Sequence, residues 1–564
     1  MKTNYASGAI ALALVALQGC GGGGGGGTPA PAPVPPAPVT PAPVTPPPVT
    51  TADQVAAPRA FSVQPLNANE AMLQWTDSSS DETGFQLERR SAGGTWAALA
   101  VAPANATLFR DAGLSADTSY EYRISALRPL RTPVTVAAPV AKTPVAAVQS
   151  VFYVDANIGL DSDAGTEAKP WKTIQKAANS LKPGQTVLVR AGTYSNTASS
   201  LVRIATSGTE GNWITYRNFP GEMPKLKTTI SKNWNGFEIY HASYIIIDGF
   251  EIEGHVKEVD LAIALADMRT PGPYASGNAI AFENRDLAKP IAHHIIVRNN
   301  YMHDHGLGGF AGMGGDYITV ENNRIYNVGA TSSYGGSGIS LLTPRPLDAN
   351  VADYKMIIRG NLSADNSNLV PCGCYSYQAP TDGNGIILDL WKNNNYTGRA
   401  LVANNLIFNN GGRGIHLFHN SKNASIDIVF NTVVKNSTIA VTGEGEITLV
   451  DAHNVRVMNN IMSARADRPL NTISSDSTNI TFSNNMVYGG NRFAGTIDAN
   501  RRLTDAESAG LFGAGTGIDG YRLGAASVAA NASVTTGLTL PETDFFLAPR
   551  VQGVRADVGA IESH

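Results

Sequence analysis

The amino-acid sequence predicts an all-β protein whose main body is a parallel β-helix, a β-solenoid, with a small β-sandwich in front of it. Short apolar strings that end in asparagine recur through the second half of the chain. Within each string the apolar residues alternate with others, as they do along a β-strand. Glycine accounts for 57 of the 564 residues, which favours turns and strands over helices.

Length, charge and cysteine content exclude several classes of protein. A chain of 564 residues is too long for one ordinary globular core, so several units are expected. The formal net charge is −4 and 16% of residues are charged, so the sequence lacks the excess of basic residues that nucleic-acid binding requires. Of the three cysteines, Cys20 lies in a targeting segment and only Cys372 and Cys374 remain, so disulfides do not build the fold.

The first nineteen residues predict a signal peptide. Lys2 is followed by the apolar run Ala9–Leu17, which is too short to span a hydrocarbon core of ~30 Å. The string Leu17-Gln18-Gly19-Cys20 resembles a bacterial lipobox, which implies cleavage before Cys20 and acylation of its thiol. Because Gly21 stands where inner-membrane lipoproteins carry aspartate, an outer-membrane lipoprotein is expected, held by its lipid only. The alternative is an extracellular protein released by ordinary cleavage.

Residues 20–55 form a predicted tether. Gly21–Gly27 is followed by a proline-alternating run over 28–50. Such a run favours polyproline II, and at ~3.1 Å per residue it reaches about 70 Å. The tether would hold the rest of the chain clear of the membrane surface.

Residues 56–144 predict the β-sandwich. Short alternating strands with turn signals between them include AMLQWTD with Trp75, and LSADTSYEYRISAL with Leu114, Tyr120 and Tyr122. These strings resemble a fibronectin type III module. No cluster of acids, histidines or metal ligands is visible in it, so a spacer role is favoured over weak sugar binding.

The solenoid prediction rests on seven strings that end at Asn300, Asn323, Asn361, Asn405, Asn431, Asn460 and Asn485. Their separations are 23, 38, 44, 26, 29 and 25 residues. Periods in the twenties, stretched twice by insertions, are typical of a β-solenoid. We expect the alternate Ile, Val and Leu residues inside the tube and the asparagines stacked as ladders at equivalent turns.

Both ends of this region resemble pectate-lyase-like proteins. The entry string Phe152–Tyr194 resembles their N-terminal coil, in which a short helix, here about 172–181, caps the tube. The closing string DVGAIE, Asp557–Glu562, resembles their C-terminal string. The resemblance implies a right-handed parallel β-helix over 150–564 and, less specifically, a polysaccharide lyase.

A second recurrent string, aligned on glycine, ends at Glu283, Leu342, Asp389 and Phe418. Its fourth position is always Ile and its sixth is Phe or Leu, so both should point inward. By alternation the fifth and seventh positions should point to solvent. Glu283, Asp389 and His416 are therefore predicted on the outside of one sheet.

The richest polar cluster of the repeat lies around Asp389. With coils ~4.8 Å apart and ~3.3 Å per residue, the Cα atoms of Asp389 and His416 should lie about 8 Å apart. Asp382 and Asn384 precede the same strand, Lys392 follows it, and Arg413 lies opposite Asn384 on the next coil.

This cluster suits β-elimination on an acidic, uronate-containing polysaccharide. A base removes the proton α to the uronate carboxylate, whose charge must first be neutralised. The lyases that the chain resembles use Ca²⁺ held by acidic residues and a Lys or Arg base. The resemblance thus implies Ca²⁺ at Asp382 and Asp389 and a carboxylate on Arg413. The base would be Lys392 or His416, and Asn384 and Glu283 are predicted substrate contacts.

Alternatives remain open at this point. Asp389 can be an ordinary solvated residue of a solenoid surface. Asp382 and Asp389 can instead be the carboxylate pair of a glycoside hydrolase. The chain can also be a non-catalytic glycan-binding adhesin. His303, Asp304 and His305 resemble a metal-binding string, although a structural role is favoured, and Cys372 and Cys374 form either a small disulfide or two thiols. A monomer is expected.

Overall fold

The computed structural model describes residues 56–564 except 80, 129–134, 138–140, 143–150, 285, 287, 440–443, 497–498, 514, 525, 536, 539–540, 552 and 564. The predicted signal peptide, the tether and the lipid site at Cys20 lie outside the described residues. Among the helices of the described part, none is long and apolar enough to cross a bilayer.

The region that precedes the solenoid in the sequence is a small β-sandwich of two antiparallel sheets. Its apolar core includes Trp75, Leu114 and Tyr122, as the alternation in the sequence predicts. The strands of the two sheets are β1 (Arg59–Asn67), β2 (Glu70–Thr76) and β5 (Leu108–Ala112), and β3 (Gly84–Ser91), β4 (Ala97–Pro103), β6 (Ser119–Leu127), β7 (Thr135–Ala137) and β8 (Ala141–Lys142).

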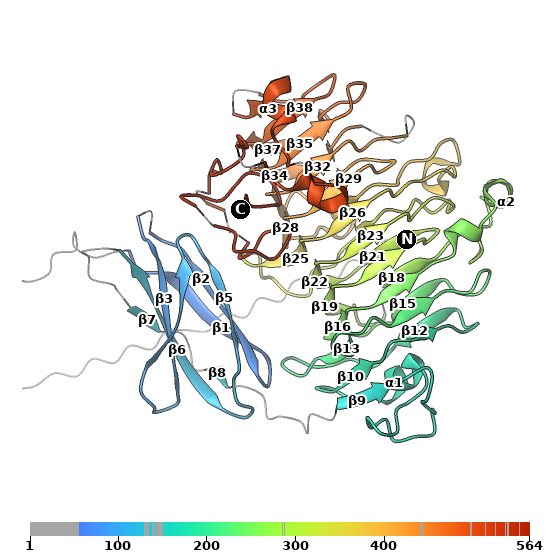
Figure 1. Cartoon of the computed structure of the whole chain (residues 1–564), viewed down its shortest axis with the longest axis horizontal. Helices are drawn as coiled ribbons and strands as arrows, with labels where there is room; N and C mark the ends of the chain where they lie inside the picture. Colours follow the sequence, from blue (N-terminus) through green and yellow to red (C-terminus); the bar gives the residue numbers. More distant parts are fainter. Residues whose placement is uncertain are drawn as a thin grey trace, which may run out of the picture. The chain divides into compact units, whose positions relative to one another are not determined.

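The main body is a parallel β-helix, as predicted, and Figure 1 shows its coils stacked from β9 upward. Most coils contribute one strand to each of three parallel sheets, named here after their first strands. The β9 sheet contains β9 (Val151–Val154), β10 (Thr186–Val189), β13 (Ile214–Asn218), β16 (Ile245–Asp248), β19 (His293–Arg298), β22 (Asp316–Glu321), β25 (Tyr354–Arg359), β28 (Arg399–Ala403), β31 (Ser425–Val429), β34 (His453–Met458) and β37 (Thr478–Ser483).

The other two sheets follow the same order of coils. The β11 sheet contains β11 (Thr193–Tyr194), β14 (Lys225–Lys227), β17 (Glu251–Glu253), β20 (Tyr301–His303), β23 (Arg324–Tyr326), β26 (Leu362–Ala364), β29 (Leu406–Phe408), β32 (Thr432–Val434), β35 (Ile461–Ala464), β38 (Met486–Gly489) and β39 (Arg501–Arg502). The β12 sheet contains β12 (Ser200–Ile204), β15 (Asn235–Ile239), β18 (Asn278–Glu283), β21 (Gly308–Met313), β24 (Ile339–Leu342), β27 (Ile386–Asp389), β30 (Ile415–Phe418), β33 (Ile447–Val450) and β36 (Asn471–Ile473).

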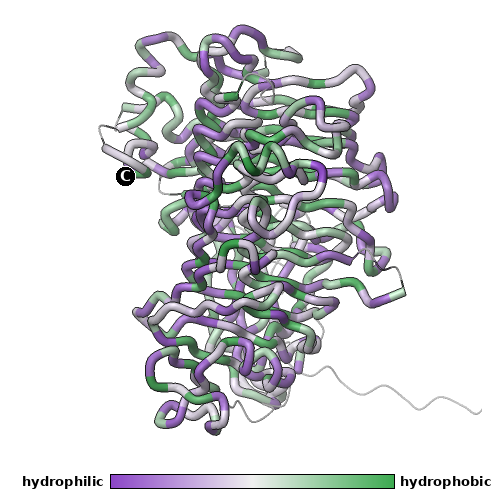
Figure 2. Tube along the Cα trace, turned by 90° about the vertical axis from the view of Figure 1, so that its right-hand side faces the viewer, coloured by the Kyte–Doolittle hydropathy of each residue, from purple (hydrophilic) through white to green (hydrophobic). Residues whose placement is uncertain are grey.

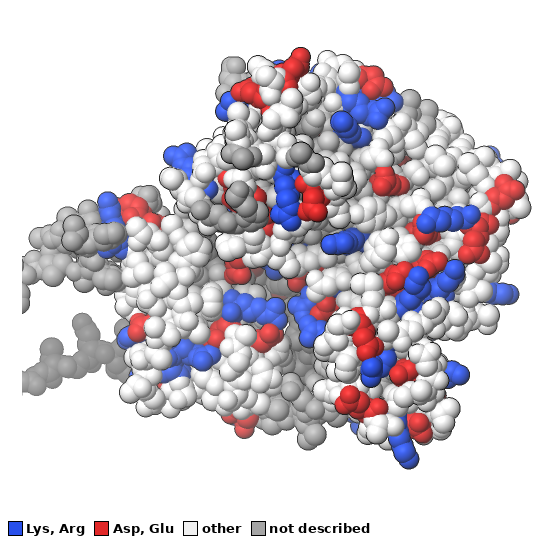
Figure 3. Space-filling model, viewed as in Figure 1, with Lys and Arg blue, Asp and Glu red and all other residues white. Residues whose placement is uncertain are grey.

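One continuous apolar core fills the tube. Along most strands buried aliphatic residues alternate with polar ones, and Figure 2 shows apolar and polar stretches alternating along the coils. On the face shown in Figure 3, acidic and basic side chains lie intermixed. This agrees with the small net charge of the chain.

The predicted asparagine ladder is confirmed. From Asn300 to Asn485 each predicted residue donates its side-chain Nδ2 to the Oδ1 of the next, at 2.7–3.0 Å. The last bond goes to Asn500, an eighth member that the sequence strings did not include. A second ladder runs from Asn366 through Asn410 and Asn436. Stacked amides satisfy buried polar groups at every turn, which explains why asparagine is favoured there.

A short helix, α1 (Ile174–Ser180), lies within the segment in which a cap was predicted. The Thr173 side chain accepts a hydrogen bond from Lys176 N, and Ile174 and Ala177 are buried in the core of the tube. The remaining helices are short: α2 (Leu261–Ala266), α3 (Asp505–Ala509), η2 (Val256–Glu258), η3 (Gly373–Tyr375), η4 (Trp391–Asn394) and η5 (Gly517–Tyr521).

The C-terminal segment folds back onto coils formed much earlier in the sequence. Ala560 N donates to Thr432 Oγ1, and Gly559 N donates to Asn459 O. Within the segment, Arg550 and Glu562 form a buried ion pair at 3.0 Å. The DVGAIE string is therefore packed against the tube.

Candidate active site

The strand register defines two rows of side chains on the outer face of the β12 sheet. The fourth and sixth string positions, such as Ile386 and Leu388, are buried in the tube as predicted. The fifth positions align as Ala281, Ala311, Ser340, Ile387, His416 and Thr448, and the seventh as Glu283, Met313, Leu342, Asp389, Phe418 and Val450. Strand β21 lies between β18 and β24 and belongs to a coil that has no counterpart among the glycine-aligned strings.

The predicted exposure of the fifth row is wrong for His416. Its side chain lies on the outer face but is only 6% exposed, as is that of Ile387. The segments before the strands lie against this row: Arg413 Nη1 donates to Thr381 O at 2.5 Å, and Thr448 Oγ1 donates to Glu444 O at 2.7 Å. Alternation predicts the direction of a side chain but not what covers it.

Asp382 lies at the centre of a hydrogen-bonded network. Its Oδ2 accepts from Thr381 Oγ1 at 2.6 Å, and its Oδ1 accepts from Asn384 Nδ2 at 3.1 Å. Burial raises the pKa of the Asp382 carboxyl group, against the opposing effect of these hydrogen bonds and of the Arg413 charge. The protonated form is therefore favoured more than in an ordinary aspartate.

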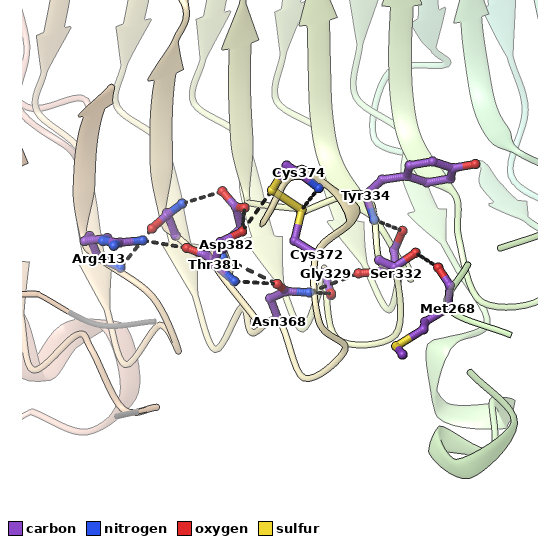
Figure 4. Close-up of a disulfide and its surroundings, with 12 residues drawn as sticks. Met268, Gly329, Ser332, Tyr334, Asn368, Cys372, Cys374, Thr381, Asp382 and Arg413 are labelled. Carbon is purple, nitrogen blue, oxygen red and sulfur yellow. Dashed lines mark hydrogen bonds between the residues drawn. A yellow bond between two sulfur atoms is a disulfide. The ribbon is translucent and has the colours of Figure 1, made fainter. Parts of the chain in front are cut away.

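A disulfide joins Cys372 and Cys374 beside Asp382, which resolves the alternative left open by the sequence. Figure 4 shows the chain of contacts: Cys374 Sγ lies 3.4 Å from Thr381 Oγ1, which in turn donates to Asp382. Gly335 lies opposite, where an added Cβ would meet Asp382 Oδ2 at 2.5 Å. Thr381 and Gly335 thus fix the position of the Asp382 carboxyl group.

Asp389 lies in an apolar part of the cluster, as the sequence indicates. Its neighbours in the row are Leu342 and Phe418, and its Oδ1 is buried without a hydrogen-bond partner. Burial, followed by repulsion from Asp382, raises the pKa of Asp389 to about 7. This carboxyl group therefore exchanges a proton near neutral pH.

His416 and Arg413 complete the cluster from the next coil. Both ring nitrogens of His416 and the Nε of Arg413 are buried without a hydrogen-bond partner among the described residues. Burial and the Arg413 charge hold the pKa of His416 well below its ordinary value, so its ring is neutral at pH 7. A neutral imidazole next to a guanidinium provides a proton acceptor beside an anion-binding group.

The structure does not bring Lys392 into contact with Asp389 or His416. Lys392 Nζ instead bonds Asp451 Oδ2 at 2.6 Å and His419 Nδ1 at 2.7 Å, and its side chain is 45% exposed. His453 Nε2 also lies 3.0 Å from Asp451 Oδ1. Lys392 therefore belongs to a separate polar group in the turns after β27, β30 and β33, which sequence spacing alone did not distinguish.

Neither predicted substrate contact lies freely at the cluster. Asn384 is fully buried, and its amide bonds Asp382, Ser337 Oγ and Arg413 N. It therefore holds the cluster together. Glu283 is in the same row as Asp389 but three coils away, at the end of β18. In the turn after β18 the buried side-chain amide of Asn284 makes no hydrogen bond with the described residues, and it is a better candidate contact that the strings missed.

Calcium was predicted at Asp382 and Asp389. Two carboxyl groups offer at most four of the 6–8 oxygens that this ion takes. In the described residues, Asp382 and Asp389 do not fall within one compact group of three or more possible ligands, and both Asp382 oxygens already accept hydrogen bonds. These residues alone do not fit a resident Ca²⁺.

The His303-Asp304-His305 string makes mainly internal contacts. Asp304 Oδ2 bonds His303 Nδ1 and Lys257 Nζ, each at 2.8 Å. His305 is buried against Ile252 O, and burial lowers its pKa to about 3. These contacts agree with the structural role favoured from the sequence.

Comparison with known proteins agrees with the fold. Residues 152–337 match a family model described as "Pel9A-like, right handed beta helix region". Over 155 residues the chain is 28% identical to the uncharacterized protein YwoF of Bacillus subtilis (strain 168). This alignment covers 27% of the chain and spans 28% of that relative. The family-model match ends before β27 and β30, so it does not include Asp389 or His416.

Two solved structures have similar coils at low identity. Pectate lyase Pel9A is 16% identical with a TM-score of 0.41, over 73% of this chain and 96% of that one. A Yersinia enterocolitica family 28 exopolygalacturonase is 13% identical with a TM-score of 0.39, over 77% of this chain and 87% of that one.

Proposed function

We propose that this chain cleaves an acidic polysaccharide at the outer face of the β12 sheet, and that it does so by β-elimination. The observation that carries the proposal is a pair of buried groups on β30 and the turn before it: the neutral His416 ring, whose two nitrogens have no hydrogen-bond partner among the described residues, and the Arg413 guanidinium, whose Nε has none. The family-model description and the uronate-active enzymes with similar coils are consistent with this substrate class.

Arg413 would bind the uronate carboxylate. Its buried Nε makes no hydrogen bond with a described residue, and a guanidinium matches a carboxylate in shape and charge. Neutralising the carboxylate lowers the energy of the enolate that forms when the α proton leaves.

His416 would accept that proton. A ring that is neutral at pH 7 is available as a base, and a bound anionic substrate makes it more basic. As the C–H bond breaks, the bond to the leaving oxygen breaks and a carbon–carbon double bond forms. Asp389, whose pKa is about 7, would protonate the leaving oxygen. Lys392, engaged with Asp451, is the less suitable base.

Calcium at Asp382 and Asp389 remains part of the proposal only if the substrate supplies further oxygen ligands. Activity of the protein with and without a chelator tests this point.

A second candidate, glycoside hydrolysis, is favoured by the two carboxyl groups. Burial raises the pKa of both Asp382 and Asp389, and the repulsion between them favours one protonated and one ionised group. Glycoside hydrolysis requires such a pair, in which the protonated carboxyl group is the acid and the ionised one is the base.

One experiment separates these functions. The protein is incubated with a panel of uronate polymers, and both ultraviolet absorbance and reducing ends are followed. A lyase forms an unsaturated product that absorbs in the ultraviolet, whereas a hydrolase forms reducing ends without it. Retardation in glycan gels without either product would contradict cleavage and favour the adhesin.

The position of the protein in the cell is also part of the proposal. Acylation of Cys20 and attachment to the outer membrane would place the cluster where polysaccharides are met. Replacement of Cys20 by serine, with detection of the released protein in the medium, tests this anchor.

A further inference from the structure

A cavity of about 950 Å³ lies on the β11 sheet, away from the proposed cleavage cluster. Its floor is formed by β20 and β23 and the turns before them, and one wall is formed by Phe545, Phe546 and Leu547 of the C-terminal segment. Ligand sites in proteins have volumes of about 300–1,000 Å³ and combine aromatic surfaces with a few polar groups. This cavity has both features.

Aromatic rings line the cavity in a fixed arrangement. Tyr301 stacks on His303 with ring centroids 4.3 Å apart, and Tyr326 meets Tyr301 edge to face at 6.0 Å. Phe545 packs with Tyr326 against the apolar cluster of β26 and β29. These rings are half-buried, so each retains some exposed surface. Aromatic faces of this kind pack against the C–H faces of sugar rings.

Charge at the cavity is balanced except at one residue. Asp304 is paired with Lys257 and His303, and the nearby Glu251 and Glu253 are each bonded to Lys225, at 2.7 and 2.8 Å. Because Lys225 pairs with Glu251 and Glu253, and Lys227 also pairs with Glu253 at 3.1 Å, their group with His303 does not require a metal ion. Arg324 lies beside Tyr301 in the register and is exposed, and no carboxylate of the described residues pairs with it.

We infer that this cavity is a second glycan site, which binds an oligosaccharide that carries carboxylate groups. The sugar ring would pack on Tyr301 and Tyr326, and its carboxylate would pair with Arg324, whose planar guanidinium binds carboxylates through two hydrogen bonds. The Asn322 side-chain amide, which makes no hydrogen bond with another described residue, lies in the turn before Arg324 and can bond a sugar hydroxyl.

The site lies on a different sheet from Asp389 and His416, so it goes beyond the proposed cleavage. A glycan bound there does not need to reach the cleavage cluster. The expected role is to hold the polymer against the protein while another stretch is processed. Two linked contacts with one polymer raise the overall affinity above that of either alone.

Calorimetry with short oligogalacturonate and oligoalginate tests the inference on the full chain carrying Asp389→Asn, which is introduced to suppress turnover. We expect two binding events per chain with at least one of these probes, and none with neutral dextran fragments. Adding Arg324→Gln should abolish one event or weaken it about tenfold or more, because a charged hydrogen-bonding partner is lost. Arg502→Gln is the matched control, an exposed arginine of the same sheet outside the cavity, and should leave both events unchanged.

Further variants separate charge from ring packing. Arg324→Ala removes the charge, as Arg324→Gln does. Tyr326→Ala removes the aromatic ring, whereas Tyr326→Phe keeps it. Tyr326→Phe should retain the event, whereas Tyr326→Ala should weaken it. If Arg324→Gln leaves both binding events unchanged, or the full chain binds neither probe, the second site does not exist. Equal binding of dextran would contradict the acidic ligand. These outcomes concern binding alone, so they are independent of whether the protein forms an unsaturated product.

Discussion

Asp389 of β27 lies directly in register with Phe418 of β30. A carboxyl group beside a phenyl ring loses solvation, and here the loss is not compensated at Oδ1 by any described hydrogen-bond donor. Such an arrangement is costly for a structural residue. It is common where a carboxyl group must exchange a proton near neutral pH.

Asp389→Asn should reduce cleavage of a uronate polymer by about a hundredfold or more, because the proton donor is lost. The melting temperature should change little, since the neutral amide replaces a poorly solvated carboxyl group. Asp467→Asn is the control, since its side chain is 66% exposed. If Asp389→Asn cleaves the polymer at the wild-type rate, the reacting groups lie elsewhere.

The same residue predicts a pH dependence of stability. The folded-state pKa of Asp389, about 7, lies above its ordinary value of 3.8. The contribution of Asp389 to the free energy of unfolding is therefore fully present below the ordinary pKa and is lost as pH rises through about 7. Relative to Asp389→Asn, the wild type should be less stable at about pH 8 than at about pH 5. Urea unfolding of both proteins at the two pH values measures this difference, and a constant difference would contradict the raised pKa.

His416→Gln should strongly reduce cleavage while leaving substrate binding by Arg413 largely intact, because glutamine cannot accept the proton. The expected signature is a fall in kcat of about a hundredfold with a small change in KM. His241→Gln, a half-buried histidine bonded to Pro290 O outside the cluster, is the control. A large change in KM with kcat retained would instead assign His416 to binding.

Reduction of the Cys372–Cys374 disulfide should lower activity more than stability. The bond closes a loop of very few residues, so its entropic contribution to folding is small. It does, however, hold Cys374 against Thr381, which bonds Asp382. We expect kcat to fall severalfold with a thiol reductant, and the same reductant should not affect Cys372→Ser/Cys374→Ser. Equal kcat in oxidised and reduced protein would show that the disulfide does not position Asp382.

Asn361→Ala should destabilise the solenoid. Its Nδ2 donates to Asn405 Oδ1 and Val320 O, while its Oδ1 accepts from Asn323. Removing a fully buried amide leaves these partners unsatisfied, at a cost of about 1–3 kcal/mol each. Chemical denaturation measures the loss, and the exposed Asn423→Ala should change stability by less than about 0.5 kcal/mol. Equal effects of the two substitutions would contradict a stabilising ladder.

The fold could be predicted because each coil repeats a local pattern. Alternation places Ile386 and Leu388 inside, and the asparagine that ends each string occupies the same turn in successive coils.

The candidate site was only partly predictable. Register brings Asp389 near His416, but the burial of His416 depends on segments of irregular length before the strands. Lys392 follows Asp389 by three residues, yet the turn directs it to Asp451, which is 59 residues away in sequence.

The bond between Ala560 and Thr432 joins residues 128 positions apart. Coils of the tube contact mainly their neighbours, so they can form progressively as the chain emerges from the ribosome. The last residues must be complete before they can dock on β32. Deletion of the final few residues would therefore leave the coils formed without this contact, and its effect would be found at β32, far from the deletion in sequence.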